Sequence, residues 1–291
     1  MFNRLKAKTI KKSFPIFQNL GIHVSLNHFY EPIPDTRNLK KTLWKKDRFL
    51  TGINYQDKKQ IELLSFFSKN YKKEYMALPA EKKGSGYYVK NGMFESVDGE
   101  ILYCMVRRFK PQQVVEAGSG FTTFLIDKAL NENKTGSLTI IDPYPDEIFK
   151  HGGIGKHKVI RDKIENVPLA SFEKLKANDV LFIDSSHVVK TGSDAQYEFM
   201  EILPRLKKGV IIHVHDIFLP SEYPMRQIVE NHVFWNEEYM LYAFMQYNDY
   251  FEVLWGGSFM HLFHSDKLEH AFPSYNKKNN WPGSFWIRKI K

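Results

Sequence analysis

Cysteine is nearly absent from this sequence, and long apolar runs are absent altogether. The single cysteine, Cys104, excludes a disulfide within the chain and a cysteine-based zinc site, and we expect a buried thiol at this apolar position. Such cysteine usage favours a reducing cytoplasm. No stretch of about 18 uninterrupted apolar residues exists, and the N-terminus lacks an apolar segment followed by a small-residue cleavage site. We therefore expect neither a membrane-spanning nor a secreted protein.

Acidic residues are scarce in the first part of the chain. Residues 1–90 carry 19 Lys and Arg against 7 Asp and Glu, a net charge of +12, whereas residues 91–291 carry 23 against 26. We therefore predict a basic N-terminal extension or lid over 1–90 and a globular domain over 91–291. The first twelve residues hold five basic and no acidic side chains, which suits a weak contact with anionic lipid and equally a solvated, frayed terminus. No signature of specific nucleic-acid recognition is present.

The remaining composition is that of a globular protein. Of the 291 residues, 43% are apolar, 26% are charged and 15% are aromatic, which is too rich in core-forming side chains for intrinsic disorder. Residues 13–38 predict an irregular lead, because two prolines in it exclude a helix. Apolar residues at steps of three and four predict helices over 60–78 and over 96–109.

A regular alternation of strand and helix patterns begins near residue 113. The predicted strands are 113–117, 137–142, 157–160, 179–184 and 209–216. Segments of helical or loop pattern separate them, at 122–131, 146–150, 169–176 and 195–206. This alternation implies a parallel sheet with helices on both faces, and the last strands are expected from 239–246, 251–255 and 259–263. The predicted fold class is α/β, a Rossmann-like, seven-stranded, mostly parallel sheet with an N-terminal helical and irregular extension.

A glycine-rich turn ends the first predicted strand, in the sequence VVEAGSGFTT at 114–123. Ligands bind beyond the carboxyl ends of parallel strands, and Gly118 and Gly120 permit a tight turn and a close approach of the backbone. A dinucleotide fingerprint needs a third glycine where Thr123 stands, and the Gly-Lys-Ser/Thr of a phosphate-binding loop is absent. Glu116 would repel a phosphate but can hold an ammonium group. The turn therefore points to a cationic cofactor.

Acids also follow the next two predicted strands. Asp142 closes the second strand, 26 residues after Glu116, where a carboxylate can accept hydrogen bonds from both hydroxyls of a ribose. In this order the acids resemble class I S-adenosylmethionine-dependent methyltransferases, whose first motif is an acid, any residue, Gly, any residue, Gly. The resemblance covers about residues 93–220 and implies an acid near the adenine amine at Asp162. The cofactor contacts that it implies are Glu116, Gly118, Ser119, Gly120, Thr123, Asp142 and Asp162.

The fourth and fifth strand ends, DVLFIDSSHVVKTGSD and GVIIHVHDIFLPSEYP, resemble methyltransferase domain family 24, bacterial proteins related to small-molecule and sugar O-methyltransferases. In metal-dependent O-methyltransferases, acids at these strand ends hold magnesium, and the corresponding residues here are Asp184, His215 and Asp216. Imidazole suits Mn or Fe better than Mg, so the resemblance leaves the divalent metal open. The same residues are equally compatible with a hydrogen-bonded pocket without metal. A two-His-one-carboxylate site would need His187 or His213 to turn inward.

His187 follows the fourth strand, where an imidazole could accept a proton from the nucleophile during methyl transfer. We therefore assign the chemistry to Asp184, His187 and His215, and predict methyl transfer from S-adenosylmethionine to an oxygen of a small-molecule acceptor. Aromatic residues of the N-terminal lead and of the segment after the fifth strand are expected to close over the acceptor. Two alternatives stay open, an iron-dependent enzyme of another reaction type and a membrane-surface or partner-binding protein with a vestigial pocket. The sequence does not determine the acceptor or the oligomeric state.

Overall fold

The computed structural model describes residues 2–45, 47–145 and 157–291. The chain divides into two compact units, one formed by Trp44–Pro224 and Trp235–Lys291 and the other by Met1–Leu43 and Met225–Phe234. Residues 44–90 thus share a unit with the sheet domain, although the charge pattern groups them with the N-terminal extension. A role of residues 1–90 as a lid stays a prediction.

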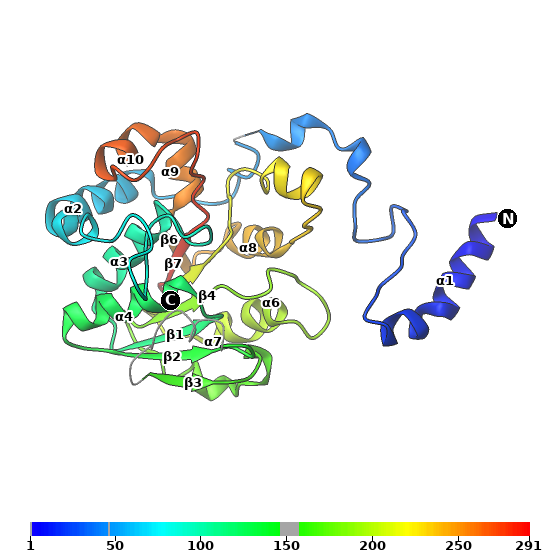
Figure 1. Ribbon diagram of the computed structural model, residues 1–291, viewed down its shortest axis with the longest axis horizontal. Coiled ribbons are helices and arrows are strands. Elements are labelled where there is room, and N and C mark those ends of the chain that lie inside the picture. The colour runs from blue at the N-terminus through cyan, green and yellow to red at the C-terminus, as the bar shows by residue number, and fades with distance from the viewer. Residues whose placement is uncertain (1, 46, 146–156) are drawn as a thin grey trace. The chain divides into compact units, whose positions relative to one another are not determined.

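A seven-stranded sheet forms the centre of the larger unit, in the order β3-β2-β1-β4-β5-β7-β6 (Figure 1). The first five strands run parallel, and β7 pairs antiparallel with both β5 and β6. The bounds are β1 (Gln113–Ala117), β2 (Ser137–Ile141), β3 (Lys158–Ile160), β4 (Val180–Ile183), β5 (Ile211–Val214), β6 (Phe251–Gly256) and β7 (Phe285–Lys289). The predicted α/β class and the first five predicted strands are confirmed.

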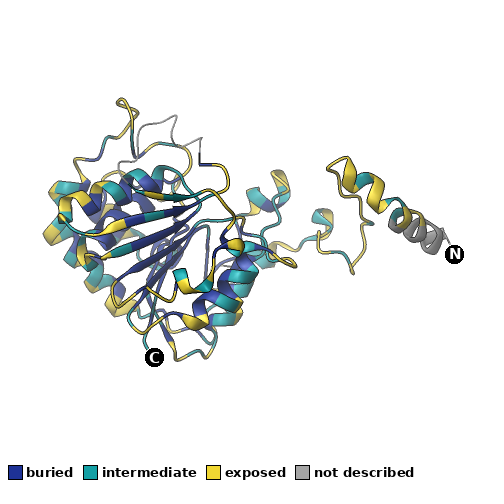
Figure 2. Cartoon of the chain, turned by 90° about the horizontal axis from the view of Figure 1, so that it is seen from below, coloured by how far each residue is buried: buried dark blue, intermediate teal, exposed yellow. Residues whose placement is uncertain are grey.

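Helices cover both faces of this sheet, and the strands between them are buried (Figure 2). On one side lie α3 (Asp98–Phe109) and α4 (Phe121–Asn133), with α2 (Asp57–Tyr75) packed on α3. On the other side lie α6 (Asp194–Tyr197), the π-helical η5 (Glu198–Ile202), α7 (Leu203–Arg205) and α8 (Glu237–Met245). The chain after β6 forms α9 (Gly257–Phe263) and α10 (Ser265–Ala271). Short 3-10 turns are η2 (Lys41–Trp44), η3 (Ile164–Asn166) and η4 (Leu169–Ser171).

Several expected elements differ from the structure. Residues 239–246 are expected as a strand, but 239–245 belong to the helix α8, in which Leu241 and Met245 are buried four residues apart on one face. Residues 259–263 likewise lie in the helix α9, and β7 supplies the seventh strand instead. The helix expected over 169–176 is reduced to the turn η4. The helix expected over 146–150 lies outside the described residues.

The smaller unit begins with the helix α1 (Phe2–Asn19), which corrects the expectation of irregular chain from residue 13. Pro15 lies inside α1, where it removes one backbone donor from the helix. The prolines of the following segment lie outside any helix, as predicted, and the turn η1 (Thr36–Asn38) and the π-helical η6 (Arg226–Glu230) complete this unit. Among the described residues, no helix combines the length and apolarity needed to cross a membrane.

The helix α2 is tied into the larger unit by side chains along its length. Phe67 is completely buried, and Glu74 accepts a hydrogen bond of 2.6 Å from Arg107 of α3. The Tyr75 hydroxyl donates to the Ala271 carbonyl of α10 over 2.9 Å. These contacts indicate that α2 belongs to the folded core of the domain rather than to a separate extension.

Phe67→Ala is expected to lower the free energy of unfolding of the whole domain by about 3–5 kcal/mol, because it removes a buried aromatic ring and leaves a cavity. Lys69→Ala, at an exposed position of the same helix, should change it by less than about 0.5 kcal/mol. Urea unfolding followed by circular dichroism and by tryptophan fluorescence measures both. Loss of a separate helical transition, with the main transition unchanged, would show that α2 folds apart from the sheet.

Candidate active site

The glycine-rich turn crosses the carboxyl ends of the central strands. The Gly118 amide donates to the Ile141 carbonyl over 3.0 Å, and the residue has a left-handed φ of +84°. A Cβ atom at this position would lie 2.0 Å from the backbone oxygen of Asp184, the residue after β4. Only glycine therefore fits at this crossing, and the turn fixes the distance between the ends of β1 and β4.

Glu116 lies beneath this turn, fully buried at the end of β1. Its carboxylate accepts hydrogen bonds from the hydroxyls of Thr122 over 2.6 Å and Thr123 over 2.8 Å, and the Thr123 hydroxyl in turn accepts from the Gly120 amide. Burial raises the pKa of Glu116 to about 8, although both threonine hydroxyls favour the ionised form. Glu116 thus supports the turn from below. A contact between its carboxylate and a cofactor ammonium stays a prediction.

Glu116→Gln is expected to change how stability depends on pH. The pKa of Glu116 is about 8 in the fold and about 4.5 in the unfolded chain, so the fold binds a proton that the unfolded chain releases between these values. This contribution is complete below about pH 4.5 and decreases by up to roughly 1.4 kcal/mol per pH unit toward pH 8.

The carboxylates of Asp142 and Asp184 add to the effect by repelling an ionised Glu116. Thermal unfolding of the wild-type protein and of Glu116→Gln is measured from pH 5 to 9. The difference between their stabilities isolates the contribution of Glu116, since both proteins contain the other buried acids. The wild-type protein should lose stability relative to the variant as pH rises. Parallel curves would show that Glu116 is ionised in the fold throughout.

Asp142 follows β2 and lines a cavity of about 380 Å³. One carboxylate oxygen accepts a hydrogen bond of 2.6 Å from the Tyr144 amide, and the other accepts from the Ser119 hydroxyl. The ends of β1, β2 and β4 and the segment that follows β3 contribute to the cavity, which is lined among others by Gly118, Asp142, Ile164, Asp184, Ser186 and Ser193. The volume lies within the roughly 300–1,000 Å³ of small-molecule sites.

Asp162 lies apart from this cavity, exposed in the loop after β3. Its Oδ1 accepts 2.7 Å hydrogen bonds from the Lys163 amide and from the Asn166 side chain. The next residues, Lys163 and Ile164, line the cavity instead. Of the acids expected near the cofactor, the structure therefore brings Asp142 to the cavity, keeps Glu116 beneath the turn and leaves Asp162 outside.

A second group of polar side chains lies where β4 and β5 end. Asp184 follows β4, Asp216 lies two residues after β5, and His187 Nε2 is 3.4 Å from Asp184 Oδ1 and 3.6 Å from Asp216 Oδ2. One ligand atom from each of the three residues lies within 4.8 Å of the others. His187 Nδ1 is 2.9 Å from Glu237 Oε2, a fully buried carboxylate of α8. We call Asp184, His187 and Asp216 the acid-histidine cluster.

The electrostatics of this cluster are dominated by burial and by the carboxylates around one imidazole. Burial alone would lower the pKa of His187, but hydrogen bonds with Asp184 and Glu237 outweigh it and raise the pKa to about 11. The ring of Trp235 lies 4.5 Å from the imidazole, centroid to centroid, and limits access of water from that side. The cluster is therefore a partly exposed site of alternating charge, in which His187 is buried and the Asp184 and Asp216 side chains are 31% and 27% exposed.

The other two histidines of this region lie differently. His215 is buried against Phe94, and its Nε2 is 3.8 Å from Asp216 Oδ1. His213 is fully buried, with Nε2 3.1 Å from the Ser284 hydroxyl and its ring stacked on Phe182. In the described part of the chain, the set that could hold a metal contains His187 rather than the His215 expected from the sequence. His187 also has a left-handed φ of 59°, which no sequence pattern predicts.

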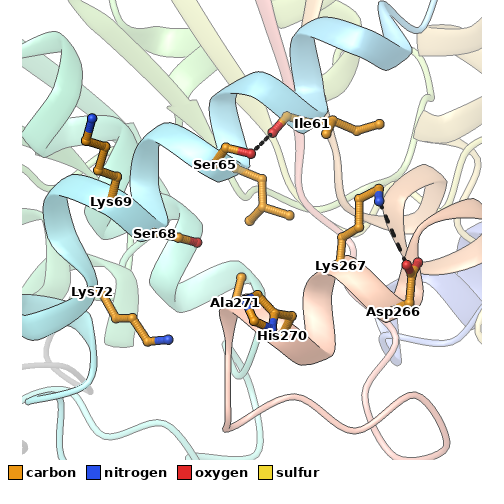
Figure 3. A pocket seen from close by; sticks show the side chains of 10 residues that line it. Ile61, Ser65, Ser68, Lys69, Lys72, Asp266, Lys267, His270 and Ala271 are labelled. Atoms are coloured by element: carbon orange, nitrogen blue, oxygen red, sulfur yellow. Dashed lines mark hydrogen bonds and ion pairs between the residues drawn. The ribbon is translucent and has the colours of Figure 1, made fainter.

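A more voluminous cavity than the one beside Asp142 lies elsewhere in the larger unit, between α2 and α10, with a volume of about 750 Å³ (Figure 3). Lysine and histidine side chains and two serines line much of it, from Ser65, Ser68, Lys69, Lys72, Lys267 and His270. None of the residues at the carboxyl ends of the strands reaches it. Its position on the helices, away from those ends, separates it from the site described above.

Comparisons with known proteins give a family match and several distant likenesses. Residues 115–217 match methyltransferase domain family 24, described as a methyltransferase domain. An uncharacterized protein of Archaeoglobus fulgidus is 24% identical over 189 residues, which cover 61% of this chain and 85% of that protein.

Two solved O-methyltransferases also align with this chain. One, from Streptomyces achromogenes, is involved in tomaymycin synthesis and was solved with S-adenosylmethionine; it covers 79% of this chain and 90% of its own at 13% identity and a TM-score of 0.40. The other, from Bacillus cereus, was solved with S-adenosylhomocysteine; it covers 80% and 91% at 15% identity and a TM-score of 0.39. The family match, the sheet order and the acid-glycine turn identify residues 115–217 as the core of a class I S-adenosylmethionine-dependent methyltransferase domain.

Proposed function

We propose that this protein transfers the methyl group of S-adenosylmethionine to an oxygen of a small-molecule acceptor, assisted by a divalent cation in the acid-histidine cluster. The observation that carries the proposal is the double position of Asp184, which lines the 380 Å³ cavity and belongs to the cluster. A cofactor in the cavity and a cation at the cluster would thus meet at one residue.

The residues of the cavity fit this cofactor. The Asp142 carboxylate stands at its wall as an acceptor for ribose hydroxyls, and the Gly118 backbone approaches without a side chain. When bound, the cofactor supplies a methyl group on positively charged sulfur, which leaves as a neutral thioether. The protein's own contribution is to hold the donor and acceptor in line and to keep water out.

The donors of the cluster fit a divalent cation, which would replace the proton that His187 holds between the carboxylates when no cation is bound. Two carboxylates and one imidazole converge, and the second ring nitrogen of His187 faces Glu237, the outer-shell carboxylate that metal-binding histidines commonly have. An imidazole ligand favours manganese, iron or zinc over magnesium. Such a cation supplies Lewis-acid polarisation of an acceptor oxygen.

The iron-dependent alternative lacks part of its expected ligand set. A two-His-one-carboxylate site needs a second imidazole, and among the described residues the cluster contains one. His213 Nε2 is hydrogen-bonded with the Ser284 hydroxyl, and the His215 ring packs on Phe94. One histidine with two carboxylates favours Lewis-acid assistance over this type of oxygen activation.

Calorimetric titration of S-adenosylmethionine and S-adenosylhomocysteine tests the proposal. Asp142→Ala should weaken the binding of both ligands by roughly tenfold to a hundredfold, because it removes charge-assisted hydrogen bonds to the cofactor. Asp162→Ala is the matched control, since that carboxylate lies outside the cavity and should leave affinity within about threefold. Absence of binding by the intact protein would contradict the proposal, and a stronger effect at Asp162 than at Asp142 would contradict this placement of the cofactor.

A further inference from the structure

The 750 Å³ cavity between α2 and α10 lies apart from the proposed methyl-transfer site, which makes no use of it. We propose that this cavity binds a small organic diphosphate, a ligand with two linked phosphate groups and an apolar or aromatic body. The volume lies within the roughly 300–1,000 Å³ of small-molecule sites. Three features of the cavity point to this ligand: the fixed position of its walls, the excess of cationic side chains and the apolar residues at its base.

Two contacts fix α2 and α10 around the cavity. His264, directly before α10, places its Nε2 2.6 Å from Oδ1 of Asp57, the first residue of α2. At the last residue of α2, the Tyr75 hydroxyl donates to the Ala271 carbonyl over 2.9 Å, and the Tyr75 ring lies 5.1 Å from the Phe272 ring, centroid to centroid. The protein's own contacts therefore form the cavity before binding, which reduces the entropy lost when a ligand enters.

Cationic side chains stand on both sides of the cavity (Figure 3). Lys69 and Lys72 come from α2, and Lys267 and His270 come from α10, each pair three residues apart and thus on one helix face. Asp266 is the one carboxylate among the described residues of the lining, and it is 77% exposed, 3.8 Å from Lys267. The lining thus has a net charge of +2 with the imidazole neutral. An anion between the helices would relieve the repulsion among these cations.

The type of cation favours phosphate over carboxylate. Lysine binds phosphate as a point charge on a flexible stem with three donors, whereas arginine is the residue that pairs with planar carboxylates through two hydrogen bonds. In the described wall of the cavity, lysines provide the charge and arginine is absent. Because the lysines stand on two helices, a ligand with two linked phosphate groups can contact both walls at once, which a single phosphate does less well.

The base of the cavity is apolar. Leu64 of α2 and Ala271 of α10 line it, and both residues are buried. Ile61 extends this surface by one turn of α2, and its carbonyl accepts a 2.9 Å hydrogen bond from the Ser65 hydroxyl. An inorganic ion would leave the apolar surface in contact with water, whereas an organic body would cover it. The cavity therefore matches an organic diphosphate better than inorganic pyrophosphate.

Calorimetric titration of the full chain with uridine 5′-diphosphate (UDP) tests this inference. S-adenosylhomocysteine is added to fill the cofactor cavity, and EDTA is added to remove any divalent cation that could hold a diphosphate at the acid-histidine cluster. UDP should bind at least about tenfold more tightly than inorganic phosphate or uridine. Absence of UDP binding, or equal binding of uridine, would overturn the diphosphate class. Binding of pyrophosphate as tight as that of UDP would overturn the organic body.

A matched pair of variants ties the binding to this cavity. Lys72→Gln and Lys73→Gln each remove one charge from the last turn of α2, but Lys73 is exposed and lies outside the lining. Lys72→Gln and Lys267→Gln should each weaken UDP binding at least about fivefold, because each removes a charge-assisted hydrogen bond. Lys73→Gln should leave the affinity within about twofold. Equal effects of Lys72→Gln and Lys73→Gln would show general charge attraction and overturn the site.

Two further measurements distinguish other sources of the phosphate and other sites. Asp142→Ala should leave UDP affinity unchanged, and loss of UDP binding in that variant would place the ligand in the cofactor cavity instead. Sedimentation with phosphatidylcholine vesicles, with and without phosphatidylglycerol, tests a lipid headgroup. Binding to the anionic vesicles that Lys72→Gln abolishes and Lys73→Gln retains, without UDP binding, would overturn a soluble ligand.

Binding of S-adenosylhomocysteine is measured for each lysine variant and shows that the variant is folded. Absence of that binding in the intact protein refutes the proposed function and leaves the diphosphate site to be judged by the lysine variants. Retained cofactor binding without UDP binding refutes the diphosphate site alone.

Discussion

Gly118→Ala is expected to lower the free energy of unfolding by about 2–5 kcal/mol and to weaken S-adenosylhomocysteine binding by more than about 100-fold. The new Cβ would lie 2.0 Å from the backbone oxygen of Asp184 and would also have to adopt a φ of +84°. Because the obstructing atom is backbone, relief requires movement of the end of β4. The Asp184 side chain, which lines the cofactor cavity and belongs to the cluster, would move with it.

Gly120→Ala is the matched control for this change. Gly120 has an extended φ of −172°, and the nearest atom to an added Cβ is the Thr122 hydroxyl at 3.9 Å. Both substitutions reduce the conformational entropy of the unfolded chain equally. The difference between their unfolding free energies therefore reports only the close contact between the turn after β1 and the end of β4. Thermal unfolding of the two variants without cofactor should show a large loss only for Gly118→Ala. Equal losses would contradict the geometry described for this turn.

The sequence carried enough information to predict the arrangement of the strand ends. Each short apolar run has an acid within two residues of its end, and a parallel sheet brings the carboxyl ends of its strands to one edge. Asp142 and Asp184 accordingly line one cavity, and Asp184 and Asp216 meet in one cluster. The need for glycine in the first turn could also be predicted from the sequence. In the structure, the close approach at Gly118 tolerates no side chain.

Other features depend on packing that no local pattern encodes. The run at 239–246 is apolar enough for a strand, but Glu237 and Glu238 begin a helix there, and burial of Glu237 beside His187 follows from tertiary packing alone. His187 has a left-handed φ and its Nε2 lies 3.6 Å from Asp216 Oδ2, and only the fold reveals this placement. The buried Asp98 likewise joins segments more than 180 residues apart, because its carboxylate accepts hydrogen bonds from the Gly283 and Ser284 amides.

Replacement of a cluster residue is expected to abolish stabilisation of the protein by divalent cations. A cation that binds only the folded state, at a concentration 100-fold above its Kd, should add about 2.7 kcal/mol to the free energy of unfolding. Zn²⁺ and Mn²⁺ should produce this stabilisation at lower concentrations than Mg²⁺, because one of the ligands is an imidazole. His187→Ala and Asp216→Asn should each weaken cation binding by at least about 100-fold, and Glu237→Gln by about tenfold to a hundredfold.

His215→Asn distinguishes the two ligand sets. The sequence favours His215 as the metal ligand, whereas in the structure the His187 Nε2 faces both carboxylates and His215 packs on Phe94. Cation binding measured by calorimetry and metal content should therefore survive His215→Asn within about threefold and fail in His187→Ala. The opposite result would indicate that Asp184, His215 and Asp216 hold the cation. If every variant bound cations as the wild type does, the cluster would be a hydrogen-bonded network without metal, and proton removal from the acceptor would fall to its carboxylates.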